Sequence, residues 1–241
     1  WLPAEAVITP RAFCSSVSPA IIAHDLDGGS PATRFAMQFA VRQGIPLLGV
    51  QHHHAHIASI LAEHRVAEPV IGIALDGVGM GTDGTVWGGE LLRVDGACFE
   101  RLGHILPYPV VNDAYATSAP WALAASILHW LGRDADIERR FAKAKKFERI
   151  SQNLKTGTDC QSTTSMGRLF DATAGLLGLT RDAAFRGQGG LLLEGIAERH
   201  GPVAALSDGW ACVDGNLDLR PLFAALADET DGGRGAALFH A

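Results

Sequence analysis

The stretch from Gln51 to Glu90 constrains the fold of this chain more than any other, because it combines strong helix and strand patterns with chemically active side chains. Apolar residues recur at three- and four-residue spacing over residues 57–61, which predicts an amphipathic helix beginning near His52. The apolar run Val70–Leu75 predicts a fully buried strand. Thr85–Val94 predicts a second strand, with no prediction about its burial. This order of elements indicates an α/β protein.

Four histidines stand at the start of the predicted helix. His52 and His56 are four residues apart, so a helix presents both imidazoles on one face, where they can chelate one metal ion. His53 and His54 are interpreted as packing residues or as hydrogen-bond partners of the ligands, since His53 shares a helical stripe with Ile57. Imidazole ligands suit iron and zinc alike. The alternative is a chance histidine spacing without a metal.

The segment Asp76–Gly84 is rich in glycine and is predicted to turn the chain between the two strands. Successive glycines allow backbone N–H groups to approach an anion closely, so the segment is a candidate phosphate site. It does not match a dinucleotide fingerprint, which must open a helix, or the ligand run of a calcium loop. A plain hairpin turn is the alternative.

The remaining pattern divides into an α/β part and a helical part. Pro31 at a helix start, Gly44 at its end and the apolar run Ile45–Val50 predict a helix followed by a strand. Asp95-Gly96 is a two-residue hairpin signal, so Ala97–Leu106 is expected to complete a three-stranded meander.

Helices are predicted for much of the chain after residue 118. They include Trp121–Leu131, a single charged helix that continues to about Ile150, Ser165–Leu177 and Gly190–His200. Gln152–Thr164 is expected to be a polar loop.

Composition excludes several classes of protein. An apolar content of 47% argues against disorder, and no apolar stretch approaches the roughly 20 residues of a membrane helix. The start of the chain shows no signal peptide, so a cytoplasmic protein is expected. The net charge of −6 does not favour a nucleic-acid surface, and the basic run Arg139–Lys146 is interpreted as the solvated face of a helix.

Three motifs together resemble the HypF carbamoyltransferases of NiFe-hydrogenase maturation, in their TsaD-like C-terminal domain: Val50–His56, Ala74–Glu90 and Ser165–Asp171. The resemblance implies the duplicated α/β fold of actin, sugar kinases and Hsp70, which is ribonuclease-H-like. Residues 1–66 would then be a remnant of the first lobe and residues 67–241 the second lobe. It also implies an incomplete domain, because the family has further strands at both ends.

The resemblance also implies an activity: transfer of a carbamoyl group from carbamoyl-adenylate to the C-terminal cysteine thiol of a HypE-like acceptor protein. Carbamoyl phosphate and ATP would be used by upstream domains. His52 and His56 would hold a divalent metal, iron or zinc, with Asp76 as a further ligand. The implied nucleotide contacts are Leu75, Asp76, Gly77, Val78, Gly79, Asp171 and Gly187.

Some segments depart from the family pattern. The family has Gly-Gly-Asp where this chain has Val111–Asp113, and the two arginines of the family motif that corresponds to Ser118–Ala122 are absent. A non-catalytic fragment or interaction module therefore remains an alternative, as does an O-carbamoyltransferase acting on a small-molecule hydroxyl. Asp171 could also simply pair with Arg168, three residues earlier on the predicted helix.

Overall fold

The computed structural model describes residues 19–241, and it divides the chain between Gln51 and His52 into two compact units. In the first unit, strand β1 (Ile22–Asp25) pairs in parallel with β2 (Leu47–Val50), and helix α1 (Pro31–Gln43) connects them. Helix α1 has Pro31 in its first turn and ends at Gly44, whose φ of 64° is left-handed. The predicted helix and strand are thus confirmed.

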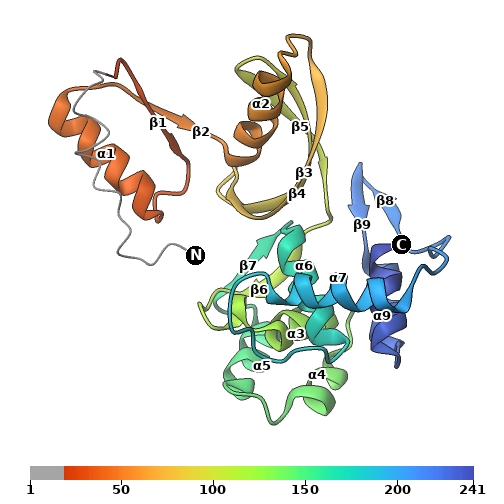
Figure 1. Ribbon diagram of the computed structural model, residues 1–241. Helices are drawn as coiled ribbons and strands as arrows, with labels where there is room; N and C mark the ends of the chain where they lie inside the picture. The colour runs from red at the N-terminus through yellow and green to blue at the C-terminus, as the bar shows by residue number, and fades with distance from the viewer. Residues whose placement is uncertain (1–18) are drawn as a thin grey trace. The chain divides into compact units, whose positions relative to one another are not determined.

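The second unit opens with a helix that is followed by the predicted three-stranded meander (Figure 1). Its elements are α2 (His52–His64), β3 (Val70–Met80), β4 (Val86–Asp95) and β5 (Cys98–His104). Both pairings are antiparallel, and Gly96 takes the positive φ of 60° that the tight β4–β5 hairpin requires. Helix α2 packs against β3 and β4. The lobe boundary at residue 66 remains a prediction.

Strand β3 is buried on one face only, so the prediction of a fully buried strand is wrong. Ile57 of α2 lies against Gly72, where an added Cβ would come within 2.4 Å of the Ile57 side chain. Alternate residues point to the opposite face. Ile71, Ile73 and Leu75 are therefore 58%, 71% and 64% exposed.

The glycine-rich segment is also not the turn that the sequence predicts. Strand β3 continues to Met80, which pairs with Val86 of β4. A β-bulge between Leu75 and Gly79 shifts the register of this pairing. The actual turn lies over residues 81–84, where Gly84 N donates to Gly81 O at 3.1 Å. Long-range pairing with β4 extends the strand, and this pairing is not visible in local glycine content.

The rest of the second unit is mainly helical. Its further helices are α3 (Pro120–Trp130), α4 (Asp134–Phe141), α5 (Phe147–Thr156), α6 (Met166–Leu176), α7 (Gln188–His200), α8 (Arg220–Asp228) and α9 (Gly232–His240), with a 3-10 turn at Ala116–Ser118. Its further strands are β6 (Tyr108–Val111), β7 (Cys160–Thr163), β8 (Ala211–Val213) and β9 (Asn216–Asp218). Helix α3 lies at the centre of the core, with residues 120–128 all buried.

Two predictions about this part are wrong. The expected single charged helix is two helices, because the chain leaves α4 after Phe141 and re-enters α5 after Lys146, whose φ is 60°. The expected polar loop Gln152–Thr164 holds the end of α5 and strand β7, which pairs with β6. Among the described residues, no helix is long and apolar enough to cross a membrane.

A candidate metal centre beside a strand bulge

The metal candidates predicted from the sequence lie together in the second unit. Helix α2 begins at His52, so one helical turn separates His52 from His56 and places both imidazoles on the same face. Asp76 lies in the bulge of β3, against which this end of α2 packs. His52, His56 and Asp76 form the one group of three potential metal ligands within the part of the chain that the structure describes.

The distances within this group fit a single ion. The Nε2 atoms of His52 and His56 lie 3.1 Å apart, and they lie 3.1 and 3.8 Å from Asp76 Oδ2. Ligand atoms about 2.0–2.2 Å from one ion lie roughly 3 to 3.5 Å from one another. His56 is 58% exposed and His52 is 32% exposed, so the group opens to solvent. The donor set of two imidazoles and a carboxylate therefore fits a divalent metal.

The two neighbouring histidines pack as predicted. The buried His53 ring stacks on Trp87 with centroids 6.3 Å apart, and its Nε2 lies 3.5 Å from Asp76 Oδ2. Burial lowers the pKa of His53, which favours the neutral imidazole. The His54 ring contacts the Phe99 ring in a tilted arrangement, with centroids 5.0 Å apart. Both residues thus support the start of α2.

Glycines allow three segments to meet at the bulge. A Cβ on Gly79 would lie 2.6 Å from His53 Cε1, so β3 contacts α2 closely there. A Cβ on Gly167, in the first turn of α6, would lie 2.8 Å from Gly77 Cα. Ser165, the N-cap of α6, donates its hydroxyl to Gly77 O. The bulge is therefore held between the histidine helix and the N-terminus of α6.

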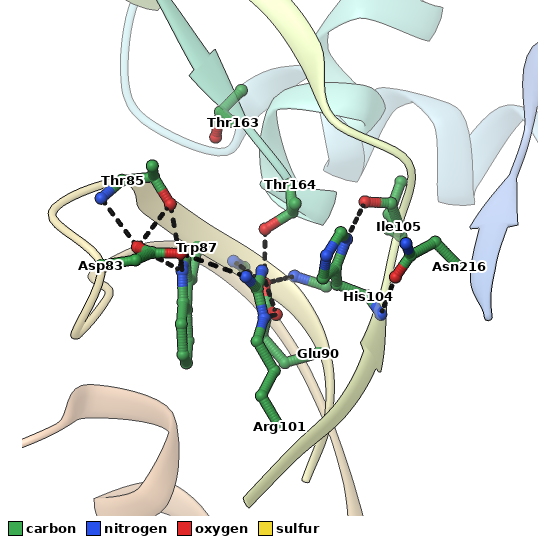
Figure 2. A network of polar contacts seen from close by, with 12 residues as sticks. Asp83, Thr85, Trp87, Glu90, Arg101, His104, Ile105, Thr163, Thr164 and Asn216 are labelled. Atoms are coloured by element: carbon green, nitrogen blue, oxygen red, sulfur yellow. Dashed lines mark hydrogen bonds and ion pairs between the residues drawn. The ribbon is translucent and has the colours of Figure 1, made fainter. Parts of the chain in front are cut away.

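A buried polar network in β4 supports the ring on which His53 stacks (Figure 2). The Trp87 indole N–H donates to Asp83, and the Arg101 guanidinium lies 3.9 Å from the centre of the Trp87 ring. Arg101 also donates to Glu90 Oε2 at 2.7 Å. The sequence pattern predicts no role for this network, although Glu90, a carboxylate directly before the apolar pair Leu91 and Leu92, was a usable signal.

Glu90 is the buried centre of this network. Its Oε1 accepts from the backbone N–H groups of Gly88 and Gly89 at 3.0 and 3.2 Å, and also from the Thr164 hydroxyl. Its side chain is fully buried. The carboxylate therefore connects β4, β5 and the segment that leads into α6.

The residues predicted to contact a nucleotide fall in two places. Leu75, Asp76, Gly77, Val78 and Gly79 form the bulge, in which Leu75 and Val78 are exposed and Gly79 is buried. Asp171 lies on α6, on the same face as Gly167 and about 6 Å further along the helix axis. Gly187, with a φ of 81°, is the N-cap of α7.

Asp171 is partly buried and approaches the start of α7. A Cβ on Gly189 would lie 2.4 Å from Asp171 Oδ1, so glycine at that position permits the close contact. Burial raises the pKa of Asp171, against a lowering by the Gly189 N–H and by the charge of Arg186. Helices α6 and α7 thus bring Asp171 beside the segment that Gly187 begins.

The alternative pairing of Asp171 with Arg168 is wrong, because the described residues include no ion pair between them. Arg168 Nη1 and Asp171 Oδ1 are both buried without a hydrogen-bond partner. Burial lowers the pKa of Arg168, and no carboxylate among the described residues balances its charge by an ion pair. Arg168 is a site candidate that sequence analysis missed, and it supplies a guanidinium of the kind that the two absent arginines would have provided.

Two protein-family models match this chain. The second subdomain of the carbamoyltransferase Kae1-like domain matches residues 72–241, and the HypF Kae1-like domain matches residues 5–63. The mixed α/β fold and the matched residues define a Kae1-like domain. The chain belongs to the HypF carbamoyltransferase family.

Relatives and solved structures agree with this membership. Carbamoyltransferase HypF2 of Cupriavidus necator is 43% identical over 252 residues, and the alignment covers 93% of this chain and 31% of that protein. A crystal structure of full-length HypF in the phosphate- and nucleotide-bound form superposes with a TM-score of 0.77 at 30% identity, covering 93% of this chain and 35% of that one. T. kodakarensis HypF gives a TM-score of 0.78 at 31% identity, covering 91% and 32%. The chain therefore spans about a third of each of these three proteins.

Proposed function

We propose that this chain is the part of a HypF-type carbamoyltransferase that binds carbamoyl-adenylate and transfers its carbamoyl group to a thiol. The acceptor would be the C-terminal cysteine of a HypE-like protein in hydrogenase maturation. His52, His56 and Asp76 would hold a divalent metal, iron or zinc. The grouping of these three side chains within one coordination shell is the observation that carries the proposal.

The surroundings of the metal group support a nucleotide beside it. The bulge Leu75–Gly79 adjoins the metal group, and α6 continues from the bulge to Asp171 and Arg168. A carboxylate and a guanidinium that both keep a buried unpaired atom suit a ligand with hydroxyls and phosphate. A full-length HypF, a relative by structure, has been crystallised with phosphate and nucleotide bound.

The proposed reaction is a substitution at the carbamoyl carbon. The acceptor thiolate forms a C–S bond to that carbon, the C–O bond to the adenylate phosphate breaks, and AMP leaves with the electron pair. The thiol proton passes to solvent. A divalent metal, when bound, would polarise an oxygen of the adenylate. Arg168 would orient the leaving phosphate, and the bulge would position it beside the metal ligands.

We further propose that the chain comprises parts of both lobes of the duplicated actin, sugar-kinase and Hsp70-type fold, with the lobe boundary after helix α2. The parallel β1–β2 pair with its connecting helix and the β3–β4–β5 meander are the elements that such a duplication predicts. Residues 1–66 would belong to the first lobe and residues 67–241 to the second.

Metal and nucleotide binding test the site first. Elemental analysis of the purified chain is expected to give about one metal per chain, and His52→Ala/His56→Ala is expected to lose it. His64→Ala is the matched control, because His64 lies at the exposed end of the same helix. Calorimetry with a nonhydrolysable carbamoyl-adenylate analogue is expected to show binding that Arg168→Gln weakens. A folded wild-type chain that holds neither metal nor analogue would contradict the proposal.

Transfer tests the reaction itself. The chain is incubated with carbamoyl-adenylate and a peptide that ends in cysteine, and mass spectrometry is expected to show one added carbamoyl group on the thiol. The same peptide ending in serine is the control for a hydroxyl acceptor. Metal and nucleotide binding without transfer to either peptide would make the chain a binding module.

A further inference from the structure

A cavity in the helical part of the second unit is lined by cationic side chains and lies apart from the metal group. Its volume is about 470 Å³, which is within the range of small-ligand sites. The walls come from α3, from α4 and the turn after it, and from the end of α6 with the loop that follows. Helix α6 begins at the bulge of β3, so its end lies roughly 14 Å further along the axis.

Four basic residues and no acidic residue line this cavity: Arg139, Arg140, Lys143 and Arg181. Arg139 pairs with Asp136 at 2.7 Å. The other three form no ion pair with any described residue, although the chain as a whole carries a net charge of −6. Like charges around one cavity repel each other and concentrate anions there.

Arg140 is the most buried of the four cations and is fixed in place. Its guanidinium donates to the backbone carbonyls of Leu176, at 3.1 Å, and of Ala227. Burial lowers the pKa of Arg140, and the charges of Arg139 and Arg133 act in the same direction. The carboxylates of Asp136 and Asp228, which do not line the cavity, partly oppose this lowering of the pKa. Backbone carbonyls thus hold a partly desolvated cation at the cavity wall, and Arg140 forms no ion pair with any described carboxylate.

Neighbouring cations in the sequence form ion pairs with described residues, unlike Arg140, Lys143 and Arg181 of the cavity. Lys146 and Arg149 both lie within ion-pair distance of Asp113, at 3.2 and 3.5 Å. The break between α4 and α5 separates Lys146, at the end of the basic run, from the cavity residues Arg139, Arg140 and Lys143. The run is therefore not the solvated face of one helix, as the sequence pattern indicated.

The loop that carries Arg181 is also anchored. The backbone N–H of Trp121 donates to Arg181 O at 3.2 Å. Gly178, with a φ of 69°, turns the chain after α6 toward this position. Arg181 is thus held on the wall that faces α4.

We propose that this cavity is a binding site for a small phosphate-bearing anion, distinct from the metal and nucleotide site. Guanidinium groups match phosphate oxygens with two parallel hydrogen bonds, and several cations around one cavity suit an anion with more than one negative charge. Phosphate esters of small metabolites and inorganic pyrophosphate share this chemistry.

The test is a titration of the full chain with inorganic pyrophosphate, followed by nuclear magnetic resonance. The backbone amides of Gly178 and Thr180 report on the cavity, whereas those of Gly77 and Gly79 report on the bulge. Saturable shifts are expected at Gly178 and Thr180, with an affinity that falls as salt rises. Citrate in a parallel titration is expected to bind more weakly, and equal binding would make the site one for carboxylates.

Charge reversal provides the variant. Lys143→Glu/Arg181→Glu is expected to weaken the pyrophosphate response at Gly178 by at least roughly tenfold. The control Lys155→Glu/Arg199→Glu makes the same change in net charge at exposed positions outside the cavity and is expected to leave the response within about twofold. No shift at Gly178 and Thr180 in the wild type, or an equal loss in both double variants, would overturn the proposal.

Discussion

Removal of the Glu90 carboxylate is expected to destabilise the second unit strongly. Glu90→Ala removes the acceptor of two backbone N–H groups, of the Thr164 hydroxyl and of Arg101. Removing one partner of a buried charge pair costs about 3–5 kcal/mol in total. Because Arg101 remains 20% exposed and can reach water, we expect a loss of about 3–4 kcal/mol.

Urea unfolding monitored by tryptophan fluorescence and far-ultraviolet circular dichroism measures this loss. For a unit of this size the slope with urea is about 2–3 kcal/mol per molar, so the midpoint is expected to fall by about 1–2 M. Glu90→Gln keeps an acceptor at the Oε1 position but places an amide against Arg101. Glu90→Gln is therefore expected to lower the free energy of unfolding less than Glu90→Ala does.

The control for this experiment is an exposed ion pair in the same strand. Arg93 and Asp95 lie 3.5 Å apart with both side chains about half exposed, so Asp95→Ala is expected to change stability by less than about 1 kcal/mol. If Glu90→Ala lowers the free energy of unfolding no more than Asp95→Ala does, the prediction is refuted. The buried network would then contribute no more stability than an exposed ion pair.

Two further substitutions test the site. Gly79→Ala is expected to lower metal affinity and stability, because the added Cβ would collide with His53. Gly77→Ala is the control and is expected to leave stability nearly unchanged, because no atom lies within 4 Å of its added Cβ. Equal losses of stability in the two variants would contradict this prediction. Asp171→Asn is expected to raise stability at pH 7 while weakening nucleotide binding. The raised pKa of Asp171 means that its stabilising contribution is complete below the ordinary value of 3.8 and is lost as pH rises through the raised value. The stability difference from wild type should therefore shrink as the solution is acidified, and a difference independent of pH would argue against burial as its cause.

Local sequence determined the elements whose signals lie within a few residues. The pairing of His52 with His56 follows from the helical period, and Gly44 and Gly96 mark a helix end and a hairpin because each takes a positive φ. The motifs around the histidines, the glycines and Asp171 were sufficient for the family, which the matched models confirm.

The tertiary structure decided how those elements meet. Whether Asp76–Met80 was a turn or a bulged strand depended on pairing with β4, and the position of Gly77 depended on packing against α6. The network around Glu90 joins residues more than seventy positions apart, as the contact between Glu90 and Thr164 shows. Sequence periodicity reports the environment within one element. The burial of an unpaired Arg168 nitrogen arises only when separate elements pack together. The same is true of the cavity beside Arg140, which no acidic residue lines.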